Sequence, residues 1–270
     1  RVPVAKVLCS AGDELCDISV NNVAALENSR FVGTLAKLDP RIPTLGRFIK
    51  HWASQRRINN RSEGTMSTYT LILQLYYFLQ TRETPILPRV CDLLTDSAVA
   101  AREEFLAAGE RAAAATAAGG AEIVTRAANA FAKEEELDVA TGRLRPLPFV
   151  TEADAIREPN RFPGLGENLQ SSGELLHDFF GLWGREDFSG RDGTGRTVFV
   201  YDASCEENDS GVLVMRCPLT GKNVNPFTPT VWRAIHAEFA RADALLTQSR
   251  SLAELCEPVE DTMGRRSLRA

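Results

Sequence analysis

Residues 16–22, CDISVNN, place an acid inside a short run of β-branched residues. Asp17 shares one face of the expected strand with Ser19 and Asn21, because side chains alternate along a strand. A carboxylate in this position could hold a hard divalent cation, which prefers oxygen ligands. It could equally lie on the solvated face of a half-exposed strand, and the pattern alone leaves both interpretations open.

A second group of candidate residues is basic. Six Lys or Arg and no acid lie between Arg41 and Arg61, in a chain of formal net charge −5. Lys50, Ser54 and Arg57 are expected on one face of a helix. A lysine is a point charge suited to a phosphate group, so one interpretation of this face is an anion-binding surface. The alternative is a solubilising helix surface.

A third group lies where the next helix should begin. Ser67 and Thr68 offer hydroxyls at a helix N-terminus, where free N–H groups suit phosphate. Tyr69 follows directly, and from the residues alone it could be a core tyrosine in a very apolar helix.

The elements that position these groups follow from periodicity. Residues 1–7 and 15–21 alternate as two strands of a hairpin. Apolar residues then recur at helical spacing, which predicts an amphipathic helix; they are Leu45, Phe48, Ile49, Trp52 and Ala53. Residues 66–80 should form a central helix, capped by Thr65 or Ser67, because they are apolar nearly all round.

Further along, residues 171–184 are expected to be helical. Residues 196–202 and 211–217 should be strands, joined by the connection 203–210. The last helix is expected at 228–246, with Thr228 as N-cap and Pro229 at the first helical position. Residues 96–137 are alanine-rich and divided by Gly119–Gly120, which suggests two helical pieces, and 138–168 should be a surface connection.

Composition bounds the class of protein. The chain has 270 residues, of which 44% are hydrophobic and 25% charged, so it can bury a core. It has no apolar run long enough for a membrane span. The acidic net charge argues against a generally basic nucleic-acid binder. Six scattered cysteines without a CxxC pair suggest reduced thiols in an intracellular protein.

The order of the segments resembles a known family. It runs from the strand acid through ALENS, DPR…IKHWA…RRIN…SEGT.S.Y and GELLHDFF to NPF before a helix. It resembles the terminal nucleotidyltransferases of the DNA polymerase β-like superfamily, above all the kinetoplastid terminal uridylyltransferases of the mitochondrial RNA-editing type. The resemblance covers about residues 1–80 and 168–247. The DPR to SEGT.S.Y run is specific, whereas the hairpin and GELL alone are weak.

The resemblance implies an α+β fold. Residues 1–30 would be the C-terminal part of a catalytic nucleotidyltransferase sheet. Residues 31–250 would form a mostly helical, PAP-associated-like nucleotide-recognition domain, with an insertion at about 96–168, and 251–270 would be a tail. In the family the nucleotide binds in the cleft between the two domains.

The resemblance also implies a metal. In the family, three carboxylates on adjacent strands hold two Mg²⁺ ions, which activate the RNA 3′-hydroxyl and neutralise the pyrophosphate. Asp17 matches the third acid and so becomes the candidate catalytic and metal-binding residue, with Mg²⁺ or Mn²⁺ as cofactor. The first two acids are not in this chain. Because its first residues already alternate like a strand, we expect it to be part of a longer enzyme.

The nucleotide-binding residues are carried over by the same resemblance. Asn28 and Ser29 match residues that contact the ribose 2′-hydroxyl and the phosphates. Lys50 matches the triphosphate-binding lysine, and Ser54 stands where the family usually has a second basic residue. The remaining matched positions are Ser67 and Thr68 for phosphate, Tyr69 for stacking on the base, and Asn225 for the base edge.

The segment that selects the base departs from the family. Relatives commonly have an acid-Pro-Phe-acid stretch that reads uracil partly through water, where this chain has Asn225-Pro226-Phe227-Thr228. Asn225 could still bond a pyrimidine edge, and Thr228 equally suits a helix cap. A position that biases some relatives against adenine matches Val231.

The function implied is metal-dependent transfer of UMP from UTP to an RNA 3′-hydroxyl, with release of pyrophosphate. The expected partners are UTP, a single-stranded RNA 3′ end and proteins of an RNA-processing complex, without a membrane. The expected location is the mitochondrion, where the resembled enzymes edit mRNA. Two alternatives stay open: a noncanonical poly(A) polymerase that uses ATP, and a silent nucleotidyltransferase-like module that binds RNA or protein.

Overall fold

The computed structural model describes residues 4–10, 12–19, 23–93, 137–138, 143–144, 162 and 164–259. The chain divides into two compact units. Unit 1 comprises Arg1–Gly33 and Asp96–Pro148, and unit 2 comprises Thr34–Thr95 and Phe149–Ala270. Within the described residues, no helix is long and apolar enough to cross a membrane. The predicted helical pieces in 96–137 lie outside the described residues, as does most of the predicted connection after them.

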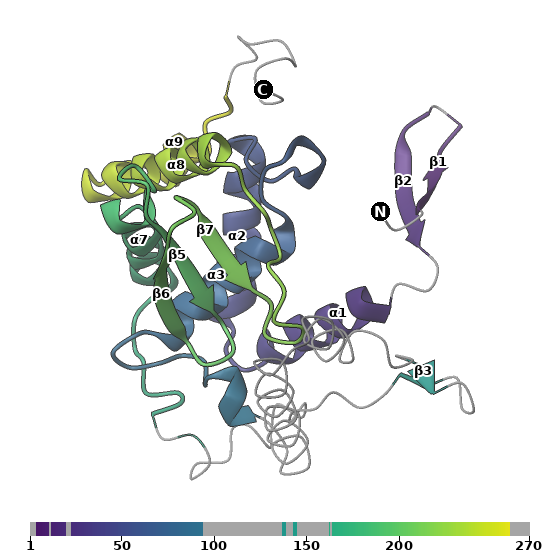
Figure 1. The fold of residues 1–270 in the computed structure, drawn as a ribbon, viewed down its shortest axis with the longest axis horizontal. Helices are drawn as coiled ribbons and strands as arrows, with labels where there is room; N and C mark the ends of the chain where they lie inside the picture. Colours follow the sequence, from purple (N-terminus) through teal and green to yellow (C-terminus); the bar gives the residue numbers. More distant parts are fainter. Residues whose placement is uncertain are drawn as a thin grey trace, which may run out of the picture. The chain divides into compact units, whose positions relative to one another are not determined.

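Unit 1 contains the expected hairpin. Strands β1 (Val4–Leu8) and β2 (Glu14–Ser19) pair antiparallel, and the register places Lys6 opposite Asp17 (Figure 1). A two-stranded hairpin alone is at best marginally stable in water. Leu8, Leu15 and Ile18 are all at least half exposed, at 55%, 65% and 51%. A second, very short pair joins β3 (Leu137–Asp138) to β4 (Arg143–Leu144).

Helix α1 (Val23–Leu35) begins in unit 1 and was not expected from the sequence. Asn28 and Ser29 therefore lie in successive positions of a helix. The segment contains no proline, and its Ala, Leu and Glu residues are good helix formers. The Ser29 hydroxyl donates to the carbonyl of Ala25 at 2.7 Å, one turn earlier.

Two helices form the centre of unit 2. Helix α2 (Arg41–Gln55) buries the predicted apolar face, including Leu45, Ile49 and Trp52. Helix α3 (Thr68–Gln80) buries ten of its thirteen residues, which confirms that it is central. The two helices approach closely at Gly46, where an added Cβ would stand 3.2 Å from Ile72 Cδ1.

Two more helices cover this pair. Helix α7 (Ser172–Trp183) begins with a capping box between Ser171 and Glu174, and α8 (Pro229–Thr247) begins at the predicted cap, where Thr228 accepts from the N–H of Val231. Trp52 packs edge-on against Phe180 with ring centroids 4.7 Å apart and also contacts Phe239. Side chains from α2, α7 and α8 thus meet in one aromatic core.

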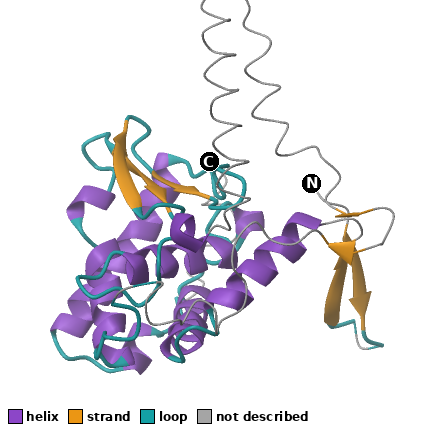
Figure 2. Cartoon of the chain, turned by 90° about the horizontal axis from the view of Figure 1, so that it is seen from below, coloured by secondary structure: helices purple, strands orange, loops and turns teal. Residues whose placement is uncertain are grey.

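A three-stranded sheet completes unit 2 (Figure 2). Its order is β6-β5-β7, with β5 (Gly195–Phe199) antiparallel to β6 (Ser204–Asn208) and parallel to β7 (Leu213–Arg216). The predicted strands β5 and β7 are confirmed, but the connection expected at 203–210 contains a third strand. The two glutamates of β6, Glu206 and Glu207, are exposed on this edge strand, and such charges protect open edges from pairing with other chains.

Short elements fasten the loops and the C-terminal segment. The described part of the chain has three 3₁₀ turns, η1 (Arg61–Glu63), η2 (Val90–Leu93) and η3 (Glu186–Phe188), and a short helix α9 (Leu252–Leu255) follows α8. Arg241 donates to the carbonyls of Glu254 and Leu255, and the N–H of Val259 donates to the Gln55 carbonyl at 3.3 Å. These bonds fasten residues 254, 255 and 259, from the segment expected to be a tail, to the rest of unit 2.

Candidate nucleotide-binding site

Three predicted site residues belong to unit 1. Asp17 lies in β2 opposite Lys6, and Asn28 and Ser29 lie in successive positions of α1, with Asn28 half-buried and Ser29 exposed. Because the Ser29 hydroxyl already donates to Ala25, its oxygen lone pairs are what it can still offer to a ligand.

The expected Mg²⁺ or Mn²⁺ ion would need several ligands around it. No group of three or more His, Cys, Asp or Glu in the described residues is placed to hold an ion. Mg²⁺ in proteins is usually held by one or two carboxylates together with substrate phosphates and water. Among the described residues, Asp17 could therefore supply only one of the several oxygen ligands that such an ion needs.

Lys50 and Ser54 project from α2 in unit 2. Both are exposed, one turn apart, on the face opposite the buried stripe of Leu45, Ile49 and Trp52. Arg57 was expected to share this face, and that expectation is wrong. Helix α2 ends at Gln55, and Arg57 turns away from the helical path with a φ of 56°.

Ser67, Thr68 and Tyr69 form the N-terminus of α3. Ser67 is the N-cap, and its hydroxyl accepts from the N–H of Thr70 at 3.1 Å. Within the described residues no group accepts from the N–H of Thr68 or Tyr69, and Thr68 is exposed. These two N–H groups point along the helix axis, at the positive end of its dipole. They can bind an anion without breaking any internal bond.

Tyr69 lies in the first turn of α3 and is half-buried beside the end of β7. Its hydroxyl lies 3.4 Å from the sulfur of the buried Cys217, and burial raises its pKa well above the ordinary value. The hydroxyl therefore stays protonated. The residue retains some exposure, so its packing as a core tyrosine leaves the stacking role a prediction.

Asn225 joins the start of α3 to the loop after β7. It is only 2% exposed. Its Oδ1 accepts from the Ser67 N–H at 3.0 Å, from the Thr70 hydroxyl at 2.8 Å and from Arg61 Nη1 at 3.1 Å. Its amide donates to the Thr65 carbonyl at 3.0 Å.

Sequence reasoning therefore missed two features of this junction. Asn225 was expected at a base edge, but its side chain is occupied inside the protein and positions the N-terminus of α3. Arg61 was considered only as part of the basic stretch, yet this exposed residue donates from Nη1 to Oδ1 of the buried Asn225. No sequence signal pairs residues 61 and 225, which are 164 positions apart.

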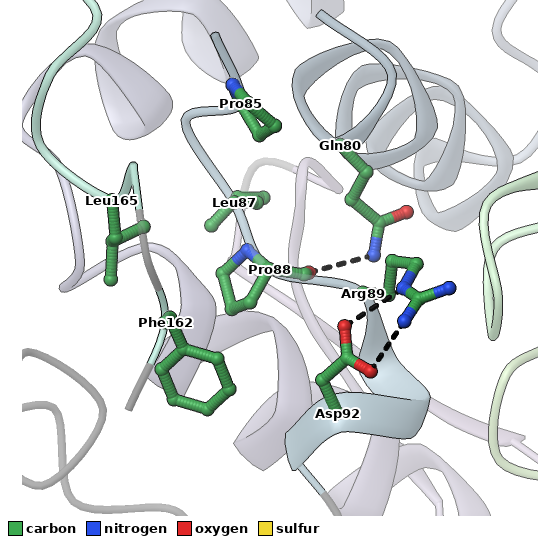
Figure 3. A pocket seen from close by; sticks show the side chains of 8 residues that line it. All are labelled: Gln80, Pro85, Leu87, Pro88, Arg89, Asp92, Phe162 and Leu165. Atoms are coloured by element: carbon green, nitrogen blue, oxygen red, sulfur yellow. Dashed lines mark hydrogen bonds and ion pairs between the residues drawn. The ribbon is translucent and has the colours of Figure 1, made fainter. Parts of the chain in front are cut away.

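A separate hollow of about 480 Å³ lies elsewhere in unit 2 (Figure 3). It contains none of the predicted site residues. Its charged groups, Arg89 and Asp92, pair with each other at 2.8 Å, and Gln80 donates to the Pro88 carbonyl. The other lining side chains are apolar: Pro85, Leu87, Phe162 and Leu165. The hollow offers no reactive group for chemistry.

The fold has known counterparts. A cytoplasmic RNA terminal U-transferase superimposes with a TM-score of 0.63 and 22% identity, over 96% of this chain and 70% of the other. The mtPAP structure in complex with UTP gives a TM-score of 0.63 and 20% identity, over 96% and 48% of the two chains. The chain therefore shares the fold of the matching part of these two structures. The Cid1 poly(U) polymerase with Mg and 3′-dATP gives a TM-score of 0.59 at 20% identity, over 96% and 72%. The expected α+β class is thereby confirmed.

The chain is also similar in sequence to two poly(A) RNA polymerases. Poly(A) RNA polymerase cid11 of Schizosaccharomyces pombe is 39% identical over 97 residues, or 36% of this chain and 20% of the relative. Human poly(A) RNA polymerase GLD2 is 36% identical over 97 residues, with the same two shares, 36% and 20%. The matched stretch thus spans about a fifth of the length of these curated relatives. No family model matches the chain.

Proposed function

We propose that this chain carries the nucleotide-recognition part of an RNA 3′-terminal nucleotidyltransferase. The observation that carries the proposal is the N-terminus of α3, where two free N–H groups, an exposed threonine and a partly exposed tyrosine ring meet. Asn225 holds this end of the helix in place. The similarity to poly(A) RNA polymerases and to nucleotide-bound structures of the same fold supports it.

The roles assigned to single residues follow the sequence expectations. Lys50 and Ser54 contact the triphosphate from α2, and the start of α3 at Ser67 and Thr68 contributes N–H and hydroxyl groups to it. Tyr69 stacks on the base. In unit 1, Asn28 and Ser29 contact the ribose hydroxyl and phosphates.

UTP is the preferred nucleotide in this proposal. UMP would be transferred to the 3′-hydroxyl of single-stranded RNA, and pyrophosphate would leave. The sequence resemblance to kinetoplastid editing uridylyltransferases supports this choice, and so do a U-transferase and a poly(U) polymerase among the structural neighbours.

ATP is the main alternative nucleotide. Both sequence relatives named above are poly(A) RNA polymerases. The chemistry would be unchanged, and the product would be a tail of adenosines.

Asp17 is proposed as one ligand of Mg²⁺ or Mn²⁺, whose charge would stabilise the leaving pyrophosphate. One structural neighbour, the Cid1 poly(U) polymerase, has Mg and 3′-dATP bound, which supports a divalent cation in this fold. The further carboxylates would have to come from outside this chain. If the mature protein lacks them, the silent module that binds RNA or a protein partner becomes the function.

We also propose that the protein acts in mitochondria, in a complex that processes RNA. The resemblance to the mitochondrial RNA-editing enzymes supports this location. Imaging of the full-length protein with a C-terminal tag tests this: a mitochondrial signal supports the editing assignment, and a purely cytosolic one removes it.

The test of the proposed function is incorporation by the full-length protein. Labelled single-stranded RNA is incubated with Mg²⁺ and each ribonucleotide separately. Extension with UTP alone supports the uridylyltransferase, and extension with ATP alone supports the poly(A) polymerase. RNA binding without extension by any nucleotide supports the silent module.

A further inference from the structure

Arg61 stands at the junction that carries the proposed base-binding end of the site. It opens η1, seven residues before α3 begins, and it is exposed. Its Nη1 donates to the Val224 carbonyl and, at 3.1 Å, to Oδ1 of Asn225. The guanidinium is therefore anchored at one corner and is not a freely moving surface cation.

At this junction Arg61, and not Asn225, is the side chain that can contact the edge of a base. Asn225 is buried, and its oxygen already accepts from Ser67, Thr70 and Arg61. Of these three donors Arg61 is the exposed one. Within the described residues, no protein group accepts from its Nε or Nη2. Of the side chains bonded to Asn225, Arg61 is therefore the one that can offer further groups to a base, and those groups are all donors.

Donors alone impose a chemical preference. Arginine has no acceptor, so it pairs with oxygens and ring nitrogens and rejects amino groups. Uracil carries a carbonyl at position 4, where cytosine carries an amino group, and adenine likewise presents an amino group at position 6. A guanidinium facing this edge therefore favours uracil over cytosine and adenine.

The geometry points to Arg61 as a specificity-determining residue that selects UTP against CTP and ATP. This inference rests on the proposed function, because it takes the start of α3 as the base-binding end of the site. It assigns to Asn225 the role of a positioning residue, which aims Arg61 through the bond at Oδ1.

The test is the ratio of kcat/KM for UTP to kcat/KM for CTP in the full-length protein, because these bases differ at the edge in question. Arg61→Ala should lower this ratio at least about fivefold, since a base-edge pair from arginine typically gives this discrimination or more. Arg250→Ala is the matched control, because Arg250 is exposed and its guanidinium pairs with Glu254, away from this junction. It should leave the ratio unchanged.

A second variant separates specificity from folding. Arg61→Lys keeps the charge but loses the fork, so it should give an intermediate ratio at an unchanged melting temperature. An unchanged ratio in both variants, or an equal fall for UTP and CTP, overturns the inference.

Failure of the inference and failure of the proposed function are distinguishable. If the wild type extends RNA with no nucleotide, the proposed function fails. Arg61 is then tested by equilibrium binding of UTP and CTP, where a wild-type preference for UTP that Arg61→Ala removes still supports it. The absence of any such preference overturns it.

Discussion

At the scale of single residues, buried polar groups hold the site in shape and exposed polar groups can contact a ligand. Asn225 is buried with partners on both its oxygen and its amide nitrogen, whereas Lys50, Arg61 and Thr68 are exposed in unit 2. A buried amide with partners on both ends is costly to change, because each unpaired group costs about 1–3 kcal/mol. Exposed groups can be changed without loss of the fold, so their effects report on ligands.

Asn225→Asp tests the positioning role. The new carboxylate keeps the acceptor for Ser67 and Thr70 but turns an oxygen toward the Thr65 carbonyl, where the amide now donates. We expect a loss of about 1–3 kcal/mol in the free energy of unfolding, measured in urea, together with weaker nucleotide binding.

Asn223→Asp is the matched control for this change. The side-chain oxygen of Asn223 accepts from the N–H of Asn225 at 3.1 Å, so an aspartate preserves the bond. Equal losses in the two variants would contradict a special role for Asn225.

Lys50→Ala tests the triphosphate contact. Lys50 is exposed on α2, so its removal should leave the melting temperature unchanged. Loss of a charged contact should weaken nucleotide binding about tenfold, measured by titration with UTP. Unchanged affinity would show that Lys50 only forms part of the solvated face of α2.

At the scale of elements, the spacing of apolar residues predicted the helices correctly, because helix formation depends on the local sequence. The helices at α2, α3, α7 and α8 and the caps Ser67 and Thr228 follow from apolar spacing and side-chain chemistry. Strand β6 was missed because SCEEN reads as a polar connection, and only its pairing with β5 makes it a strand. The engagement of Asn225 was missed for a similar reason, since its partners lie 155–164 positions away.

The segment 94–161, which has no assigned function, provides an element-scale prediction. Arg89 and Asp92 before it and Phe162 and Leu165 after it line the same hollow, so its two ends lie close together (Figure 3). Replacement of 94–161 by a glycine-serine linker of about ten residues should therefore be compatible with the fold of unit 2.

The measurement is thermal unfolding followed by near-ultraviolet circular dichroism, which reports the aromatic core around Trp52 and Phe180. A cooperative transition with a native-like aromatic signal is expected. A molten spectrum would show that the segment is needed for the packing of unit 2.

At the scale of the whole molecule, stability should depend on pH through His236. Its side chain is 2% exposed and lies 2.9 Å from the Arg185 carbonyl, and burial lowers its pKa. The unfolded chain binds a proton near the ordinary histidine pKa of about 6.5, whereas the folded chain binds it only at a lower pH. The free energy of unfolding should therefore fall as the pH drops below about 6.5.

Urea unfolding between pH 7.5 and 5 measures this dependence. His236→Gln removes the titrating group and keeps an N–H donor for the Arg185 carbonyl, so the fall in stability should become shallower. An identical pH profile in the variant would assign the effect to other groups.

The central claim is nucleotidyl transfer to RNA, with the start of α3 as its nucleotide-binding end. The most direct measurement is extension of a labelled single-stranded RNA by the full-length protein with Mg²⁺ and one ribonucleotide at a time, with Asp17→Ala as the inactive control. We predict a ladder with UTP that Asp17→Ala abolishes while UTP binding is partly retained. Extension unaffected by Asp17→Ala, or no extension with any nucleotide by folded protein that binds RNA, would contradict the account.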